Sequence, residues 1–314
     1  MKLKKPKFWD YNKPNLISYF LNPFAKILEL KLKFSKKSKN KFNSIKSICV
    51  GNIYVGGTGK TSISIELKKI LDNEKIKSCF IKKEYREQKD EQMLLKKFGK
   101  TFINKSRVEA LKNAIKENYD FAIFDDGLQD SSISYDLTFV CFNKKNKVGN
   151  GRLIPAGPLR ETIKSIKDYD NIFLNGNDEN LEDFKNFLKK ENTNLNFYES
   201  KYEIQNFDTI DKEKNYIVFS GIGNHSTFID TLKKNQIKLI EEIEYPDHYQ
   251  YKKNDLEKIL KIAKNKNAKV LTTEKDYLRI DPKYHSHINF IKVFLKIDQL
   301  DKLKKKLKNL YENN

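Results

Sequence analysis

A glycine-rich segment ending in Lys-Thr is the part of this chain best suited to bind phosphate. It reads Gly56-Gly57-Thr58-Gly59-Lys60-Thr61. An apolar run, 47–53, precedes it and a helical pattern of apolar residues follows it, which is the strand–loop–helix context of a phosphate-binding loop. Backbone N–H groups and the positive end of the helix would surround a polyphosphate. Lys60 would then contact the β- and γ-phosphates, and the Thr61 hydroxyl would hold Mg²⁺.

The loop departs from the usual spacing at one position. A standard loop has a glycine five residues before Gly59, where this chain has Tyr54, and an extra glycine pair follows instead. The alternative interpretation is a glycine-rich turn that only ends a strand. Because strand, Gly-Lys-Thr and helix coincide, the sequence favours phosphate binding over that turn. The loop by itself does not indicate which reaction follows.

Two adjacent aspartates follow a second apolar strand. Asp125-Asp126-Gly127 comes directly after Phe-Ala-Ile-Phe at 121–124. The carboxyl ends of parallel strands form the edge where open α/β sheets bind ligands, and a carboxylate at that edge holds Mg²⁺ in phosphate-loop enzymes. Many strands also end in an Asp-Gly turn, so the acidic pair indicates a metal site chiefly because a phosphate loop lies upstream.

The elements that must position these residues alternate between strand and helix from residue 47 onward. Expected strands are 47–53, 78–81, 121–125, 137–142, 172–174 and 197–204, then a second series at 216–219, 237–243, 270–272 and 288–294. Expected helices include 107–117, 181–190, 226–234, 254–264 and 298–311. This rhythm predicts an α/β fold with a phosphate-loop (Walker A) kinase-like parallel sheet covered by helices on both faces. We expect that domain at 46–205, and a second, smaller α/β domain with the C-terminal basic helix at 206–314.

The first 45 residues differ in composition from the rest. Lysines flank the aromatic pair Phe8-Trp9, and apolar residues are frequent and charges few between 16 and 30. Such a segment is typical of a helix lying in a membrane interface, and a helix packed on the domain core explains the pattern equally well. Pro14 and Pro23 are expected to divide the segment into short pieces. No apolar run is long enough to predict a transmembrane helix.

The charge balance favours an anionic partner. The 314 residues contain 62 Lys+Arg against 42 Asp+Glu, a formal net charge of +20, which suits nucleic acid, an anionic membrane or a phosphorylated substrate. We find no nucleic-acid motif and expect no nucleic-acid partner. Only five of the basic residues are arginine, the side chain best suited to bidentate phosphate recognition. The cysteines lie in separate apolar runs, and are expected in the core of a protein from a reducing compartment.

Several further segments of the sequence are distinctive. They are Asp125-Asp126-Gly127-Leu128-Gln129, Val148-Gly149-Asn150-Gly151, the run from Leu153 to Glu161, Gly221-Ile222-Gly223-Asn224, Tyr245-Pro246-Asp247-His248 and Thr272-Thr273-Glu274-Lys275-Asp276. Together these segments resemble the tetraacyldisaccharide 4′-kinase family, the lipid A 4′-kinases. The phosphate loop also has the family's spacing, including its lack of the first glycine. The motifs come in the family's order from about residue 8 to about residue 280.

The resemblance implies a reaction and a location. It implies transfer of the γ-phosphoryl group of ATP, with Mg²⁺, to the 4′-hydroxyl of an acylated glucosamine disaccharide 1-phosphate in lipid A biosynthesis. The expected place is the cytoplasmic face of the bacterial inner membrane, as a peripheral protein on its anionic surface. The alternative is a phosphate-loop kinase or ATPase acting on a different small molecule. The sequence does not indicate an oligomeric state.

The resemblance also implies roles for individual residues. Asp90, Lys60 and His248 would be catalytic, with Asp90 as general base and His248 tuning it. The loop from Gly56 to Thr61 would bind ATP. The other implied residues are metal ligands, Thr61, Asp125, Asp126 and Glu161, and contacts to substrate or phosphate, Tyr85, Gln129 and Arg160. Without the family match, Asp90 in its charged run reads as part of a solvated face, His248 as a surface histidine and Thr273 as a helix cap.

The chain departs from the family pattern at several positions near these residues. Lys83-Glu84 replaces Arg-Gly before Tyr85, Lys89 replaces a glycine before Asp90, and Asp130 stands where a histidine normally follows Gln129. These departures concern the substrate contacts and the surroundings of Asp90. They leave the loop lysine, its threonine and the paired aspartates intact.

Overall fold

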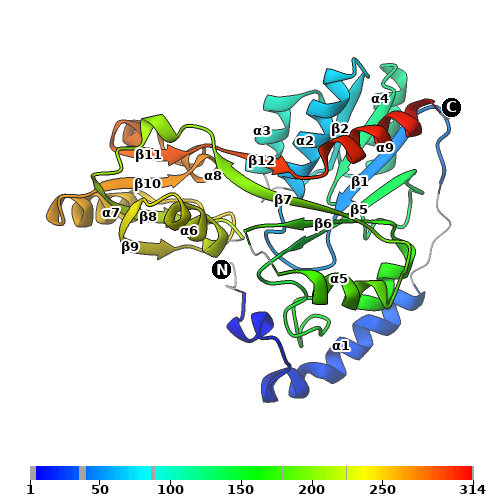
Figure 1. Ribbon diagram of the computed structural model, residues 1–314, viewed down its shortest axis with the longest axis horizontal. Coiled ribbons are helices and arrows are strands. Elements are labelled where there is room, and N and C mark those ends of the chain that lie inside the picture. The colour runs from blue at the N-terminus through cyan, green and yellow to red at the C-terminus, as the bar shows by residue number, and fades with distance from the viewer. Residues whose placement is uncertain (1–4, 35–39, 86–88, 178–179, 224, 313–314) are drawn as a thin grey trace. The chain divides into compact units, whose positions relative to one another are not determined.

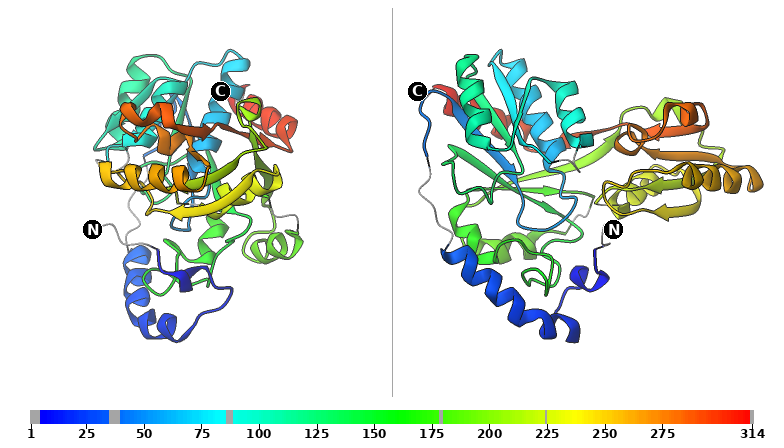
Figure 2. Two further views of the ribbon diagram at one scale, coloured as in Figure 1. Left: turned by 90° about the vertical axis from the view of Figure 1, so that its left-hand side faces the viewer. Right: turned by 180° about the vertical axis from the view of Figure 1, so that it is seen from behind.

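The computed structural model describes residues 5–34, 40–85, 89–177, 180–223 and 225–312 (Figure 1). The chain divides into two compact units. The larger contains Lys5–Ser200 and Ile297–Asn314, and the smaller contains Lys201–Lys296. Each unit has a parallel sheet with helices on its faces (Figure 2).

The larger sheet has β1 near its centre, with the phosphate loop directly after that strand. Within the described residues its strand order is β12-β7-β6-β5-β1-β4-β2-β3. The pairs from β7 through β3 are parallel. The bounds are β1 Lys46–Gly51, β2 Ser78–Lys83, β3 Thr101–Asn104, β4 Phe121–Asp125, β5 Leu137–Asn143, β6 Asn171–Asn175, β7 Asn196–Ile204 and β12 Val293–Ile297. Parallel order brings the carboxyl ends of β1, β2 and β4 to one edge, where the phosphate loop and the two aspartates Asp125 and Asp126 lie.

Helices cover both faces of this sheet because alternate side chains of its strands point to opposite sides. Cys49 and Phe124 point to the face that α4, Arg107–Lys116, buries with Ala110 and Leu111. On the same face α5, Glu182–Lys189, packs Phe184 against β5 and β6. The other face carries α2, Lys60–Asn73, whose Thr61 and Ser64 reach Asp125. Next to α2 lies α3, Lys89–Phe98; a short η2 helix, Ile163–Asp168, precedes β6.

The three cysteines are buried and free, as the sequence predicts for core residues. Burial raises the pKa of the Cys79 thiol to about 12. These thiols are therefore protonated and unreactive at neutral pH.

The N-terminal segment forms a short η1 helix, Lys7–Asp10, and then a single helix α1, Leu16–Phe34. The expectation that Pro23 ends a helical piece is wrong, since it lies inside α1. An interior proline removes one hydrogen bond and crowds the preceding turn, and the packing of Leu21 and Ala25 with Leu153 and Leu159 offsets that cost. Among the described residues, no helix is long and apolar enough to span a bilayer.

In the part of the smaller unit that the structure describes, the sheet has four strands in the order β11-β10-β8-β9, and every pair is parallel. Tyr216 and Val218 point to the face covered by α6, and Ile217 and Phe219 to the face covered by α7. The bounds are β8 Asn215–Ser220, α6 His225–Lys234, β9 Lys238–Glu244, α7 Lys253–Asn265, β10 Lys269–Thr273, α8 Glu274–Tyr277 and β11 Ile288–Ile291, with the short helices η3 Phe207–Thr209 and η4 Pro282–His287. The predicted fold class, a helix-covered parallel sheet plus a second smaller α/β sheet, is confirmed.

The C-terminal helix differs from its expected place in the smaller domain. The predicted strand 288–294 is in fact two strands, β11 in the smaller sheet and β12 in the larger one. The chain thereby returns to the larger unit, where α9, Leu300–Glu312, buries Leu303 and Leu307. Tyr311 lies 6.1 Å from the Phe121 ring, between ring centroids. The apolar side of α9 thus finds its partners on the larger sheet.

Candidate active site

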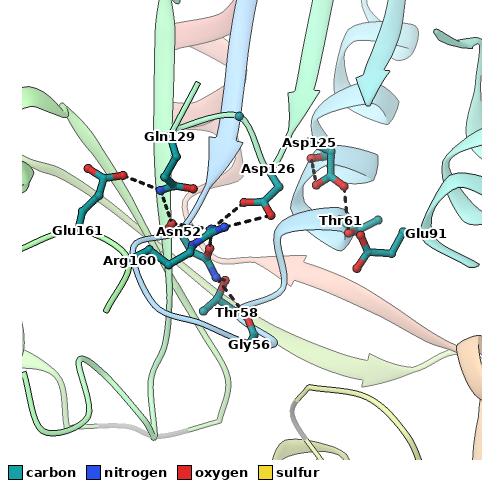
Figure 3. Close-up of polar contacts among 12 residues, drawn as sticks. Asn52, Gly56, Thr58, Thr61, Glu91, Asp125, Asp126, Gln129, Arg160 and Glu161 are labelled. Atoms are coloured by element: carbon teal, nitrogen blue, oxygen red, sulfur yellow. Dashed lines mark hydrogen bonds and ion pairs between the residues drawn. The ribbon is translucent and has the colours of Figure 1, made fainter. Parts of the chain in front are cut away.

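The phosphate loop connects β1 to α2 and is held from inside by an asparagine. Asn52 is fully buried, and its amide donates to Thr58 Oγ1 at 2.9 Å and to the Gly56 carbonyl at 3.2 Å (Figure 3). Gly56 and Gly59 have φ of 117° and 85°, which explains why glycine stands at these positions. Sequence reasoning missed the role of Asn52, although an asparagine at the end of an apolar strand is a recognisable turn signal.

Tyr54, which replaces the standard glycine, anchors the loop to the N-terminal segment. The ring is buried beside Leu153 and Leu159, and the hydroxyl hydrogen-bonds the Asp10 carboxylate. Lys5 Nζ donates to the same hydroxyl at 3.1 Å. Burial, and then the neighbouring Asp10 carboxylate, raise the Tyr54 pKa far above its ordinary value, so the phenol is neutral. The bulky side chain at this position therefore packs as a structural anchor.

Asp126 and Arg160 form an ion pair at the mouth of the loop. Arg160 Nη2 donates to Asp126 Oδ1 at 2.7 Å, and Nη1 donates to Oδ2 at 3.3 Å (Figure 3). The same guanidinium donates to the Asn52 carbonyl at 2.8 Å. Burial by itself would raise the Asp126 pKa, but Lys60 and Arg160 outweigh it and hold the pKa well below its ordinary value. Arg160 thus binds a carboxylate bidentately, a geometry that lysine cannot reproduce.

Gln129 and Glu161 continue this network beside the loop. Gln129 Nε2 donates to the Asn52 carbonyl at 3.0 Å and to Glu161 Oε1 at 2.5 Å. The other oxygen of Glu161 accepts from the Tyr169 hydroxyl at 3.0 Å. The structure therefore brings Gln129, Arg160 and Glu161 together around Asn52, as the family motifs imply (Figure 3).

Asp125 lies on the other side of the loop and is fully buried. Its carboxylate accepts from Thr61 Oγ1 at 3.3 Å and from Ser64 Oγ at 3.4 Å. Lys82 Nζ lies 2.5 Å from Asp125 Oδ2 and 2.7 Å from Glu91 Oε2. Sequence reasoning did not single out Lys82. The available signal was a lysine directly after the apolar strand 78–81, because a charged side chain that extends a buried strand requires a partner of opposite charge.

Asp90 is in the first turn of α3 and only 6% exposed, which differs from the solvated face that its charged run suggests. Glu91 in the same turn is the residue held by Lys82. Tyr85 is 40% exposed, with Lys83 Nζ 5.8 Å from its ring centroid. Residues 86–88, and with them Arg86, lie outside the described part of the chain.

The departure at Asp130 has a structural partner. Asp130 Oδ2 accepts from Arg107 Nη1 at 3.0 Å, and Arg107 Nη2 donates to the Asp126 carbonyl at 2.5 Å. Arg107 is itself buried. The aspartate at this position therefore neutralises a buried arginine that supports the turn after β4.

His248 belongs to the smaller unit, in a turn built by the Thr-Thr-Glu-Lys-Asp motif. Its backbone N–H donates to the Gly221 carbonyl at 2.9 Å, and its φ is 58°. Arg279 donates to the same Gly221 carbonyl at 3.0 Å and to Asp276 Oδ1 at 2.8 Å. Asp276 also accepts from the Gly221 N–H at 2.9 Å and from Tyr251 at 2.7 Å. The proximity of His248 to Asp90 stays a prediction, because the two residues belong to different units.

Thr273 does cap α8, since its hydroxyl accepts from the Asp276 N–H at 3.0 Å. The cap interpretation of this motif is therefore correct but incomplete. The residue that the cap orients, Asp276, is fully buried and organises the turn of His248.

The oxygen donors on the Asp125 side of the loop fit a magnesium ion that arrives with a nucleotide. Mg²⁺ is usually bound through one or two carboxylates, with phosphates and waters completing its shell. Thr61 Oγ1 and Asp125 Oδ2 lie 3.3 Å apart at the start of α2. Within the described residues no three acidic, histidine or cysteine side chains gather around one point.

Comparison with known proteins agrees with this geometry. The family model described as tetraacyldisaccharide-1-P 4′-kinase matches residues 17–312. The chain belongs to the tetraacyldisaccharide 4′-kinase family. The tetraacyldisaccharide 4′-kinase of Pelagibacter ubique (strain HTCC1062) is 53% identical over 314 residues and covers 100% of both chains. That of Rickettsia canadensis (strain McKiel) is 36% identical over 301 residues, 89% of each chain. These matches confirm the family predicted from the motifs.

A solved member of the family has the same fold. The crystal structure of an "apo" form LpxK from Aquifex aeolicus in complex with ATP superposes with a TM-score of 0.71 at 24% identity, covering 94% of this chain and 100% of that one. This likeness supports the arrangement of sheets and helices described above.

Proposed function

We propose that this kinase transfers the γ-phosphoryl group of ATP to the 4′-hydroxyl of tetraacyldisaccharide 1-phosphate, a step of lipid A biosynthesis. The observation that carries the proposal is a phosphate loop facing Asp125 and Asp126 at one sheet edge, in a chain that matches the 4′-kinase family over residues 17–312. Family membership supplies the reaction, and the sheet edge supplies the groups that phosphoryl transfer requires.

The loop residues would bind and orient the nucleotide. Backbone N–H groups of Gly56 to Gly59 and the start of α2 would surround the phosphates, and Lys60 would contact the γ-phosphate. Thr61 and Asp125 would hold Mg²⁺, which neutralises phosphate charge as it develops. Arg160 and Gln129 both donate to the Asn52 carbonyl, so they keep the loop in its phosphate-binding conformation.

Asp90 would accept the proton of the attacking sugar hydroxyl. It is buried in the first turn of α3, and a carboxylate held within hydrogen-bond reach of the hydroxyl can take its proton. His248, from the smaller unit, would adjust the basicity of Asp90. Tyr85, which is partly exposed, would contact the sugar. Both roles are carried over from the family motifs.

The exposed face of α1 would bring the enzyme to its lipid-bearing substrate. Its apolar side chains are largely exposed, among them Leu16 at 87%, Phe20 at 78% and Ile27 at 65%. Exposed apolar side chains gathered along one helix mark an interaction site, and the net charge of +20 favours an anionic bilayer. We propose that α1 lies in the interface of the inner membrane, at its cytoplasmic face.

The reaction is tested with the purified full chain, ATP, Mg²⁺ and the acylated disaccharide 1-phosphate in detergent micelles. The expected product carries a new 4′-phosphate. The Pelagibacter ubique relative, assayed in parallel, verifies the substrate and conditions. Formation of product by the relative but not by this chain would contradict the proposal, and turnover of a soluble acceptor without any lipid surface would favour the alternative substrate class.

The membrane surface is tested by sedimentation with vesicles of phosphatidylglycerol or of phosphatidylcholine. Phe20→Asp removes an exposed aromatic that contributes about 2 kcal/mol on burial, so binding to the anionic vesicles should fall at least about tenfold. Tyr311→Asp, at an aromatic of α9 that is 37% exposed, is the control outside α1 and should bind as the unaltered chain does. Equal binding of Phe20→Asp and the unaltered chain would contradict the proposed surface.

A further inference from the structure

Lys82 is a buried lysine for which the chemistry above has no role. Its side chain is 1% exposed, and Nζ lies 2.5 Å from Asp125 Oδ2 and 2.7 Å from Glu91 Oε2. A buried ammonium is tolerated only where opposite charges and hydrogen bonds compensate for its lost hydration. Two carboxylates provide that compensation here, and both come from elements that carry proposed catalytic residues.

The register of the sheet explains the first of these contacts. β2 and β4 are parallel neighbours with Ile81 opposite Phe124, so Lys82 and Asp125 come next on each strand. Side chains at paired positions point to the same face, which is the face that α2 covers. Lys82 therefore reaches the carboxylate that also accepts from Thr61 at 3.3 Å.

The second contact joins this carboxylate to α3. Glu91 lies in the first turn of α3, directly after Asp90. One ammonium thus connects the end of β4, beside the phosphate loop, with the turn that holds the proposed base. In the proposed reaction, Asp125 serves the ATP side of the transferred phosphoryl group and Asp90 serves the attacking hydroxyl. The separation of these two carboxylates therefore determines whether the hydroxyl attacks in line.

Simple charge compensation in the core is the competing explanation. Lys68 is the available comparison, since it is also buried but pairs within its own helix, four residues along, with the 47% exposed Asp72 at 2.5 Å. Lys82 instead bridges two different elements. An apolar side chain at Lys82, with its partners also replaced, would satisfy the core equally well, so fold stability alone does not account for the lysine.

We propose that Lys82 is a positioning residue that ties the first turn of α3 to Asp125 and so sets Asp90 relative to the phosphate loop. The inference rests on the proposed roles of Asp90 and Asp125. Lys82 would not touch ATP or the sugar. Its loss should therefore lower kcat while leaving the KM for ATP nearly unchanged, because Lys60 and the loop amides are still in place.

The experiment compares Lys82→Met, Glu91→Gln and the control Lys68→Met in the full chain. For Lys82→Met we expect kcat to fall about 100-fold, the loss typical of a displaced reacting group. The KM for ATP should stay within about threefold. In the nucleotide-free protein, the amides of 93–95 should exchange hydrogen at least about tenfold faster, with the amides of β1 unchanged. Lys68→Met should match the unaltered chain in kcat and in both exchange rates.

Glu91→Gln keeps the fold testable if Lys82→Met does not fold. It removes one charge from the same contact and should change kcat and α3 exchange in the same direction. The double variant should lose no more than Lys82→Met alone, since both changes break one connection. A folded Lys82→Met or Glu91→Gln with unaltered kcat and unaltered α3 exchange would overturn the inference. Absence of product from the unaltered chain would instead refute the proposed function. The hydrogen-exchange measurement would still test whether Lys82 connects α3 to Asp125.

Discussion

Replacing Arg160 with lysine tests whether the phosphate loop depends on a bidentate guanidinium. Arg160 makes two hydrogen bonds to Asp126, at 2.7 and 3.3 Å, and it also donates to the Asn52 carbonyl at 2.8 Å and to the Asn52 side-chain oxygen. Lysine keeps the positive charge but presents its donors from a single nitrogen. It can retain one or two of these contacts, and it cannot span the Asp126 carboxylate and the loop carbonyl in one plane.

The size of the effect follows from the contact that is lost. A hydrogen bond to a charged group contributes about 1.5–3 kcal/mol. The Arg160 side chain is 25% exposed, so solvent screens part of the electrostatic attraction to Asp126. We therefore expect a contribution in the lower half of that range. A loss of about 2 kcal/mol corresponds to roughly 30-fold in kcat/KM for ATP.

The assay is 4′-phosphorylation at varied ATP, together with direct measurement of ATP affinity. Arg152→Lys is the matched control, since Arg152 bonds Asn22 at 3.2 Å and lies over the Tyr19 ring of α1. That variant should keep kcat/KM within about twofold. If Arg160→Lys also stayed within about twofold, the bidentate contact would not support the loop and the reasoning would be refuted.

Three further outcomes are expected. Lys60→Ala should lower turnover by about 10³-fold or more, because the γ-phosphate loses its direct cationic contact; substantial activity in the same assay would refute that role. Burial by itself would raise the Glu199 pKa, but Lys144 and Lys185 hold it below its ordinary value. Glu199→Gln should therefore cost about 1–2 kcal/mol in urea unfolding at pH 7. The deficit should shrink as the pH falls below about 4.5, where unfolded Glu199 is protonated, and a pH-independent deficit would contradict the assignment. Tyr251→Phe removes a 2.7 Å hydrogen bond to Asp276, so hydrogen exchange in the His248 turn should rise about tenfold while that of β1 does not; unchanged exchange would show that the bond does not hold the turn.

Much of the site could be predicted because its signals are local. The strand–loop–helix pattern around Lys60 and the apolar strand before Asp125 concern neighbours in sequence, and parallel topology alone places both at one sheet edge. The motifs that identified the family are likewise continuous segments. Their roles rest on chemistry that a few adjacent residues carry, so no knowledge of distant contacts was needed.

Predictions failed where distant segments decide the outcome. The segment 288–294 is predicted to be one strand, yet the chain leaves the smaller sheet after Ile291 and joins the larger one at Val293. Pro23 lies inside α1 because packing offsets the broken hydrogen bond. The charged run before α3 suggests a solvated face, whereas Asp90 is buried. Local propensity cannot anticipate these results, because tertiary packing overrides it.

A phosphate loop, an acidic strand end and the motifs of a lipid A 4′-kinase are all evident in the amino-acid sequence. The contacts that hold these parts in place become visible only in the folded chain. Asn52 closes the loop from within, Tyr54 anchors it to the N-terminal segment, and Lys82 joins Asp125 to Glu91. A motif specifies which groups react, whereas buried hydrogen bonds and ion pairs depend on partners that are distant in sequence and that folding brings within reach.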